Sequence, residues 1–434
     1  MTTHGGRHAW TVALVTFTVL LAAAGVRTAP GILLQPWAAE FGWTRAGISL
    51  AVAISFVAFG LGGPFVGSLI DRLGPRRVML GGLGLVTAGL LPLLVMRSLW
   101  HLHLLWGVLV GMGTGMLGSV LGATVAYQWF DRNRGLVLGL LGTASSFGSL
   151  LFYPAITWVT LQAGWRTALG ALALGCVALL GAVAVLVRNR PAPVAAADDA
   201  LPPSDSGATQ ANIPLGAALR TADFWLLAGS FFVCGYTSDG IVGTHFIGHT
   251  VEHGFSPVVA AGTMSLISVA NVAGTVLSGW LTDRLDNRKL LATFYGLRAF
   301  SLVYLPFLGG MGGLLLFALI MGLDWSATVP PTVNLIAGRF GKASLGKVYG
   351  WVFCAHMIGA GLASYAGGLV RDLVGTYTIA FLSAALLGFM ALAMVVRLSA
   401  RGSAPHHVLD SHPAGHGERA GQNRELLSAG GPGE

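Results

Sequence analysis

Twelve long runs of apolar residues, separated by short polar segments, constrain this 434-residue chain more than any other feature. An α-helix rises about 1.5 Å per residue and the hydrocarbon core of a bilayer is about 30 Å thick, so about 20 apolar residues span it. The pattern therefore predicts an all-α polytopic membrane protein with twelve transmembrane helices. The runs lie at residues 10–34, 45–69, 78–96, 101–127, 136–160, 166–187, 224–248, 257–281, 290–309, 312–337, 346–370 and 375–397.

The composition agrees with this class. Hydrophobic residues make up 54% of the chain and charged residues only 10%, whereas an average soluble domain carries about 25% charged residues. So few charges cannot coat a water-soluble globule, which excludes a soluble enzyme, a disordered scaffold and a coiled coil. The 63 glycines fit a membrane bundle, because small residues let helices approach closely in lipid.

The positions of the basic residues predict the orientation of the chain. With the N-terminus placed in the cytoplasm, 19 Arg and Lys residues fall on the inner side and four on the outer side. Cytoplasmic loops of membrane proteins carry such an excess. We therefore expect both termini in the cytoplasm, and we attribute the net charge of +8 to basic loops rather than to a nucleic-acid partner.

The chain divides into five segments. A stretch rich in proline and aspartate separates the sixth run from the seventh and is too polar to bury a core, which predicts a flexible linker. The expected order is a cytoplasmic N-terminal segment (1–9), an N-terminal six-helix bundle (10–187), a flexible cytoplasmic linker (188–222), a C-terminal six-helix bundle (223–397) and a disordered cytoplasmic tail (398–434).

Two loops repeat one motif. Gly67–Arg77 reads GSLIDRLGPRR, and Gly279–Lys289, 212 residues later, reads GWLTDRLDNRK. This repeat predicts two parallel six-helix units related by an axis along the membrane normal. We expect the loops to form gating contacts that hold one conformation; alternatively, their basic residues only anchor the topology. The expected gating residues are Gly67, Asp71, Arg72, Arg76, Arg77, Gly279, Asp283, Arg284, Arg288 and Lys289.

These paired Gly-x-x-x-Asp-Arg loops on a six-plus-six helix plan resemble the major facilitator superfamily. Three stretches further resemble its monocarboxylate transporter branch: Glu40–Ser49, Tyr127–Gly142, and Leu323–Leu335 together with Gly350–Gly361. The resemblance implies a secondary active transporter that moves a small organic anion by alternating access, coupled to protons, and not an enzyme. The expected partners are a small-molecule substrate with H⁺ and the lipid bilayer of a cell membrane, such as a bacterial inner membrane, and the expected functional unit is a monomer.

One departure from the branch leaves the substrate open. Many monocarboxylate carriers have an Asp and an Arg four residues apart in the eighth span. The resemblance implies that this Arg binds the carboxylate of the substrate. This chain has Asn271 and Thr275 there. Export of an amphipathic or cationic solute is therefore an alternative, and a non-transporting membrane sensor is a second one.

Polar residues inside the spans are the candidate pathway residues, because ionisable groups at membrane depth are costly and usually functional. We expect Arg27 or Arg298 to attract the carboxylate, and Asp324 and His356 to exchange the proton. Arg298 can also act by pairing inward with Asp324. The alternatives to these roles are that Arg27 reaches the outer headgroups, that Arg298 lies on a helix peripheral to the cavity, and that His356 is a packing histidine. The full candidate set is Arg27, Asp239, His245, Asn271, Thr275, Arg298, Asp324 and His356.

The tenth span contains its own helix-breaking signal. Asp324 and Trp325 are followed by Pro330 and Pro331, and a broken helix is tolerated in lipid only where protein or a water-filled cavity satisfies its backbone groups. We expect a kinked helix that lines the cavity, or alternatively a purely structural kink. No metal-ligand spacing, catalytic triad or phosphate-binding loop stands out, so we expect no cofactor and no metal.

Overall fold

The computed structural model describes residues 4–130, 134–187, 213–307, 309–341 and 344–398, and all regular structure in these ranges is helical. Eleven helices in this part of the chain are long and apolar enough to cross a membrane. One of them, α7 (Arg134–Leu186), has a non-helical residue, Gly164, with φ of 81°. Gly164 divides α7 into two arms, so the predicted number of twelve spans depends on counting these arms separately.

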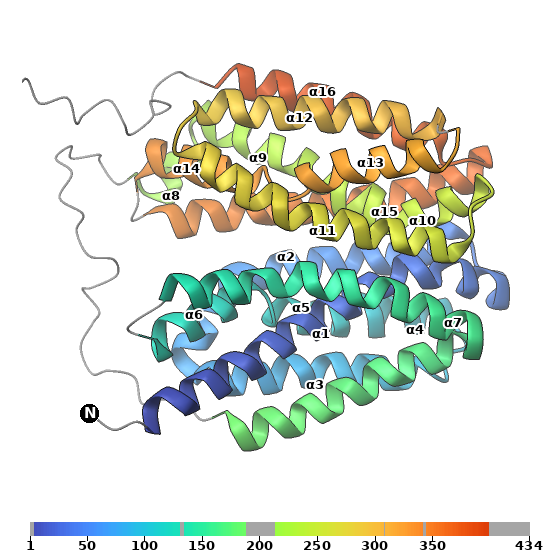
Figure 1. The fold of residues 1–434 in the computed structure, drawn as a ribbon, viewed down its shortest axis with the longest axis horizontal. Helices are drawn as coiled ribbons and strands as arrows, with labels where there is room; N and C mark the ends of the chain where they lie inside the picture. The colour runs from blue at the N-terminus through green and yellow to red at the C-terminus, as the bar shows by residue number, and fades with distance from the viewer. Residues whose placement is uncertain (1–3, 131–133, 188–212, 308, 342–343, 399–434) are drawn as a thin grey trace, which may run out of the picture.

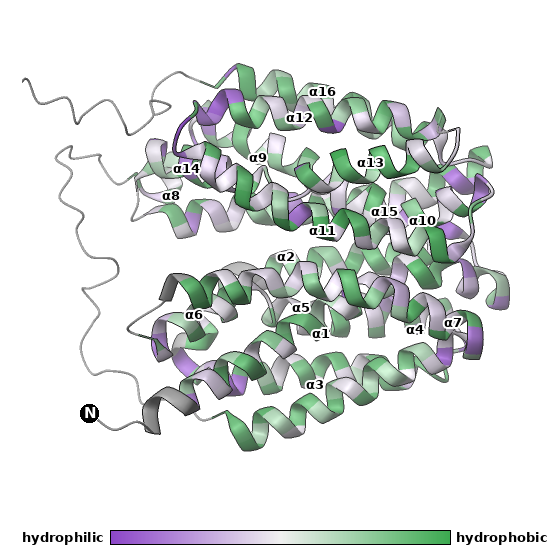
Figure 2. Ribbon diagram, viewed as in Figure 1, coloured by the Kyte–Doolittle hydropathy of each residue, from purple (hydrophilic) through white to green (hydrophobic). Residues whose placement is uncertain are grey.

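The helices form two groups that lie side by side, α1–α7 and α8–α16 (Figure 1). The first comprises α1 (His4–Phe41), α2 (Arg45–Leu73), α3 (Pro75–Leu93), α4 (Leu99–Leu102), η1 (His103–Val110), α5 (Gly111–Met116), α6 (Ser119–Trp129) and α7. The second comprises α8 (Leu215–Ala218), α9 (Ala222–Gly235), η2 (Tyr236–Val242), α10 (Gly243–Glu252), α11 (Pro257–Thr282), α12 (Asn287–Tyr304), η3 (Leu305–Phe307), α13 (Met311–Asp324), α14 (Val329–Phe340), α15 (Leu345–Val374) and α16 (Thr378–Val396). Figure 2 shows hydrophobic residues along the helices and hydrophilic residues mostly near their ends.

Small residues allow the helices of each group to pack closely. A side chain at Gly274 of α11 would overlap the Leu323 backbone of α13, and one at Gly359 of α15 would overlap the Phe232 carbonyl of α9. Gly113 lies in the same way against the Gly82 carbonyl of α3. Glycine at these positions thus brings backbones into contact, as small residues do in membrane bundles.

The two halves are joined at one end of the molecule, where α15 ends and α2 begins. The Asp372 carboxylate accepts hydrogen bonds from the backbone N–H groups of Arg45, at 3.0 Å, and Ala46, at 2.7 Å. The first N–H groups of a helix have no partner within the helix, and its N-terminus carries partial positive charge. A carboxylate of one half therefore caps a helix of the other half.

The repeated loops lie at the opposite end, and their described contacts stay within one half. Arg76 donates to the Ala184 carbonyl at 2.7 Å, and Arg288 donates to the Leu398 carbonyl at 2.8 Å. A side chain at Gly67 or Gly279 would meet no other residue within 4 Å, so these glycines do not bring helices together in this conformation. The gating role of these loops stays a prediction. Arg72, Arg77, Asp283, Arg284 and Lys289 are exposed, and the Asp71 side chain lies outside the described residues.

The predicted linker is too long at its C-terminal end. Residues 213–221 pack on the second half: the Ile213 N–H donates to the Phe340 carbonyl at 3.0 Å, α8 buries Ala218, and Thr221 caps α9. The apolar side chains of Ile213 and Leu215 explain this packing. The prolines nearby made the whole segment look like a linker in the sequence. The rest of the predicted linker, 188–212, and residues 399–434 of the predicted tail lie outside the described residues, whereas Leu398 is buried.

Replacing Asp372 with Ala should loosen the joined end, because two capping hydrogen bonds between the halves are lost. Gln35 of α1 faces Gly248 of α10. In a background without the three native cysteines, we expect a cysteine introduced at position 35 to react faster with a maleimide in Asp372→Ala than in the parent. Glu252→Ala is the matched control, because Glu252 pairs with Arg371 of its own half at 2.8 Å. Equal labelling of all three proteins would contradict the capping role.

Candidate functional site

A central cavity of about 560 Å³ lies between the two halves. Helices α1, α2 and α7 line it from one half, and α9, η2, α11, α15 and the segment between α13 and α14 line it from the other. Among the described lining residues the charged ones are Arg27 and Asp239, and one histidine, His356, joins them. The cavity thus collects a cation, a carboxylate and an imidazole within largely apolar walls.

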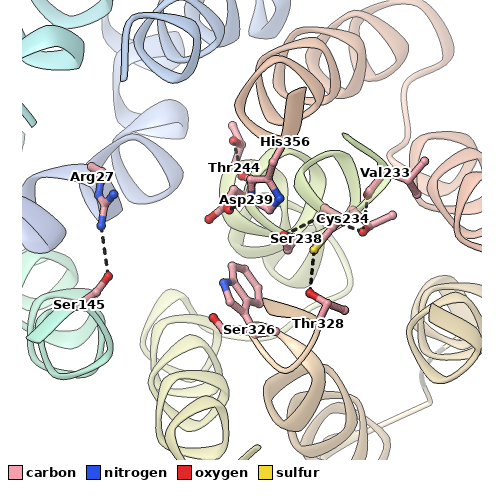
Figure 3. Close-up of polar contacts among 12 residues, drawn as sticks. Arg27, Ser145, Val233, Cys234, Ser238, Asp239, Thr244, Ser326, Thr328 and His356 are labelled. Atoms are coloured by element: carbon pink, nitrogen blue, oxygen red, sulfur yellow. Dashed lines mark hydrogen bonds and ion pairs between the residues drawn. The ribbon is translucent and has the colours of Figure 1, made fainter. Parts of the chain in front are cut away.

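Arg27 of α1 points into the cavity rather than toward the bilayer surface. Its Nη2 donates to the Ser145 hydroxyl of α7 at 3.1 Å, and its Cζ lies 4.8 Å from the centre of the Phe59 ring of α2. The side chain is exposed to the cavity and carries no carboxylate partner among the described ion pairs. Figure 3 shows Arg27 and Ser145 on one wall, opposite Asp239 and His356. The guanidinium is therefore available to an incoming anion.

Asp239 and His356 form a pair on the opposite wall. Asp239 Oδ2 lies 3.0 Å from His356 Nε2, and the two side chains are 33% and 9% exposed. Asp239 lies on η2, a short π-helix within the seventh span, and such wide turns frequently occur at functional sites. The His356 ring is flanked by Phe353 and Phe231, with ring centres 5.7 Å and 4.8 Å away. The pair can exchange a proton with the cavity, since the carboxylate remains partly accessible.

Asn271 is the hub of a second polar group on the wall. Its Oδ1 accepts from the Ser326 backbone N–H at 3.0 Å and from the Thr275 hydroxyl at 3.2 Å. Its Nδ2 donates to the Ser146 hydroxyl of α7 at 3.2 Å. Asn271 and Thr275 thus share one face of α11. The Asn271 amide connects this helix both to α7 of the other half and to the backbone at the break in the tenth span.

Arg298 and Asp324 form an ion pair behind the cavity wall. Their side chains are 0% and 2% exposed, and Arg298 Nε donates to Asp324 Oδ2. Arg298 Nη2 also donates to the backbone carbonyls of Asp324, at 2.8 Å, and Trp325, at 3.1 Å, while Nη1 lies 2.9 Å from Cys234 Sγ. Buried charges require such pairing, because their removal from water is costly.

This pair explains the break in the tenth span. Helix α13 ends at Asp324 and α14 begins at Val329, so the carbonyls at the break lose their helical partners. Arg298 satisfies two of them, and Pro330 and Pro331 fall in the first turn of α14, where a missing N–H costs nothing. The expected kinked, cavity-lining helix is therefore present, with Trp325 and Ser326 in the wall.

The structure thus brings four of the eight candidates to the cavity with suitable chemistry and a fifth, Thr275, beside Asn271. It places Arg298 and Asp324 outside the lining, which corrects the expectation that they contact substrate and exchange its proton. The reason is that each neutralises the other across α12 and α13. His245 is also outside the lining: it is buried, and its Nε2 lies 2.7 Å from the Ser364 carbonyl.

Several lining residues were missed from the sequence. Ser145 and Ser146 partner Arg27 and Asn271, and the only signal for them is a Ser-Ser pair within an apolar run. Phe59 and Phe353 are indistinguishable from lipid-facing aromatics in sequence. Cys234 also lines the cavity, and its Sγ lies 3.3 Å from the Thr328 hydroxyl and 2.9 Å from Arg298 Nη1.

Removing one partner of the Arg298–Asp324 pair should destabilise the fold. We expect Asp324→Ala to cost about 3–5 kcal/mol of unfolding free energy, because it leaves a buried unpaired guanidinium. Unfolding by heat or SDS in detergent micelles measures this loss. Glu40→Ala is the control, since its pair with Arg166 is exposed and should cost only about 0.2–1 kcal/mol. Equal stability of the two variants would contradict the structural role of the buried pair.

Comparisons with known proteins agree with the fold. The family model described as the Major Facilitator Superfamily matches residues 15–327 and 268–427. An uncharacterized MFS-type transporter of Bacillus subtilis, YcxA, is 29% identical over 401 residues, which cover 90% of this chain and 95% of the relative. Monocarboxylate transporter 13 of Bos taurus is 28% identical over 387 residues, covering 87% of this chain and 86% of the relative.

Solved structures share the helix arrangement. A crystal structure of a bacterial homolog of the human lysosomal transporter Spinster, in an inward-facing and occupied conformation, superimposes with a TM-score of 0.71. It is 14% identical, and the match covers 90% of this chain and 96% of that one. These relatives indicate transport rather than catalysis. The chain belongs to the Major Facilitator Superfamily as a multi-pass membrane transporter, and it resembles the monocarboxylate transporter branch.

Proposed function

We propose that this protein carries a small organic monoanion across the membrane together with a proton. The observation that carries the proposal is the position of Arg27, a guanidinium exposed to the cavity and held by a serine hydroxyl rather than by a carboxylate. A guanidinium binds a carboxylate through strong, charge-assisted hydrogen bonds. The similarity to a protein named monocarboxylate transporter 13 supports the same class of substrate.

The Asp239–His356 pair supplies the proton site in this proposal, in place of Asp324. With His356 neutral, the charges of Arg27 and Asp239 balance in the empty cavity. An entering monoanion adds one negative charge, and a proton on His356 restores the balance. Unbalanced charge is costly in a medium of low dielectric constant. The loaded and empty states are both neutral only if each monoanion travels with one proton.

Alternating access follows from the contacts between the halves. Asp372 joins the halves at the end where α2 begins, whereas the described contacts of the repeated loops at the opposite end stay within one half, and we infer that this opposite end is the open one. We place the open end in the cytoplasm, on the basis of the basic loops, so that this conformation faces inward. Rocking of the two halves about the central site then exposes it to either side. We propose that the protein acts as a monomer in a bacterial inner membrane, with both termini in the cytoplasm.

Export of a cationic or amphipathic solute is the second candidate. Asp239 favours it, because its carboxylate is 33% exposed and can attract a cation. The missing eighth-span Arg, at Thr275, favours it as well. The two candidates differ in which cavity charge matters: an anion needs Arg27, whereas a cation needs Asp239 and is repelled by Arg27. A sensor would bind a solute at either charge without moving it.

Arg27→Gln should weaken uptake of the anion. The loss of charge-assisted hydrogen bonds is worth about 1.5–3 kcal/mol, which corresponds to an increase in KM of about 10- to 100-fold. Uptake of labelled carboxylates into proteoliposomes measures the change. Arg166→Gln is the control, because Arg166 pairs with Glu40 away from the cavity. An unchanged KM would sink the anion proposal, and faster movement of a cation by Arg27→Gln would favour the alternative.

His356→Gln should separate transport from the proton gradient. In the parent protein we expect uptake to rise as the outside pH falls, because protonation of His356 accompanies anion entry. The variant should lose accumulation driven by a pH gradient, because glutamine cannot carry the proton that balances the anion, and an unchanged unfolding temperature in detergent shows that it is folded. His245→Gln, a buried histidine outside the cavity, serves as the control. Gradient-driven accumulation by His356→Gln would overturn the assignment of the proton site.

A further inference from the structure

A continuous row of aromatic rings connects Arg27 with His356 across the cavity. The Arg27 Cζ lies 4.8 Å from the Phe59 ring centre, and the Phe59 and Phe353 ring centres are 6.2 Å apart. Phe353 stacks on His356 with an interplanar angle of 6°. The row begins on α1 and α2 of one half and ends on α15 of the other. It therefore occupies the path between the proposed anion and proton sites.

The rings belong to the wall of the cavity and not only to the protein interior. Phe59, Phe353 and Phe231 all line the cavity, and Phe353 is partly exposed. Trp325 adds an indole from the helix break that Arg298 holds in place. Aromatic walls are suited to flat partners, because rings prefer offset-stacked or edge-to-face neighbours at centre distances of about 4.5–7 Å.

The size of the cavity argues against a very small substrate. Its volume of about 560 Å³ lies within the range of about 300–1,000 Å³ typical of sites for drug-sized ligands. A two- or three-carbon acid bound to Arg27 would leave the exposed part of Phe353 in contact with water. A carboxylate attached to a ring would occupy Arg27 and cover Phe59 and Phe353 at the same time.

We propose that the preferred substrate is an aromatic monocarboxylate, whose carboxylate binds Arg27 and whose ring lies along Phe59 and Phe353. This inference rests on the proposed function and specifies the substrate class of the same site. The far end of the row, at Asp239 and His356, offers a polar contact to a hydroxyl group on such a molecule. The site then selects the substrate by its aromatic ring as well as by its negative charge.

Three 2-hydroxy acids with the same head group test the proposal in proteoliposomes: lactate, 3-phenyllactate and 3-cyclohexyllactate. We expect the KM of phenyllactate to be about tenfold or more below that of lactate and about threefold or more below that of cyclohexyllactate. A preference for lactate, or equal KM values for the two ring compounds, overturns the aromatic assignment and leaves anion transport intact. Uptake of none of the three overturns the proposed function itself.

Variants of the row locate the selectivity. Phe353→Leu should reduce the preference for phenyllactate over lactate about fivefold or more, because it removes the central ring of the row. Exchange of labelled lactate shows that the variant is folded, and Phe59→Leu provides a second, independent variant. Phe300→Leu is the matched control: Phe300 lies 65% exposed on α12, paired with Phe389, away from the cavity. An unchanged preference in both Phe353→Leu and Phe59→Leu shows that the row only packs the interface, and overturns the proposal.

Discussion

The C-terminal half depends on one buried cation. The Arg298 guanidinium donates hydrogen bonds to the Asp324 carboxylate, to two carbonyls at the break between α13 and α14, and to the Cys234 sulfur. These contacts tie α12 to the tenth span and to α9. A membrane interior provides no water to replace any of them. The break can exist because the guanidinium satisfies it, and the break in turn brings Trp325 and Ser326 into the cavity wall.

The cavity divides its chemistry between the two halves. Arg27 and its serine belong to the first half, whereas Asp239, His356 and Asn271 belong to the second. Asn271 reaches across to Ser146, so that the eighth span contacts the first half through a neutral amide. In the proposed rocking movement, the distance between Arg27 and the Asp239–His356 pair changes. The contact between Asn271 and Ser146 is neutral, so breaking it separates no charges.

Most of the fold could be predicted from the sequence, because hydropathy, loop charge and the repeated motif are local or periodic signals. The site could be predicted only in part. Membrane depth identified every ionisable candidate, but not the direction in which each side chain points. The sequence favoured Asp324 over Asp239 as the proton site, but in the structure Asp324 pairs with Arg298 of α12, whereas Asp239 on the π-helix η2 lines the cavity. Ser145 and Phe353 contact Arg27 and Phe59, which lie more than one hundred residues away in the sequence.

The cap that Asp372 places on α2 has a consequence for how such contacts evolve. Both of its donors are backbone N–H groups, which every amino acid except proline supplies. This contact therefore accepts any residue except proline at positions 45 and 46, whereas position 372 must supply a hydrogen-bond acceptor. A search for paired substitutions between the halves would pass over this contact, although it joins residues more than three hundred positions apart.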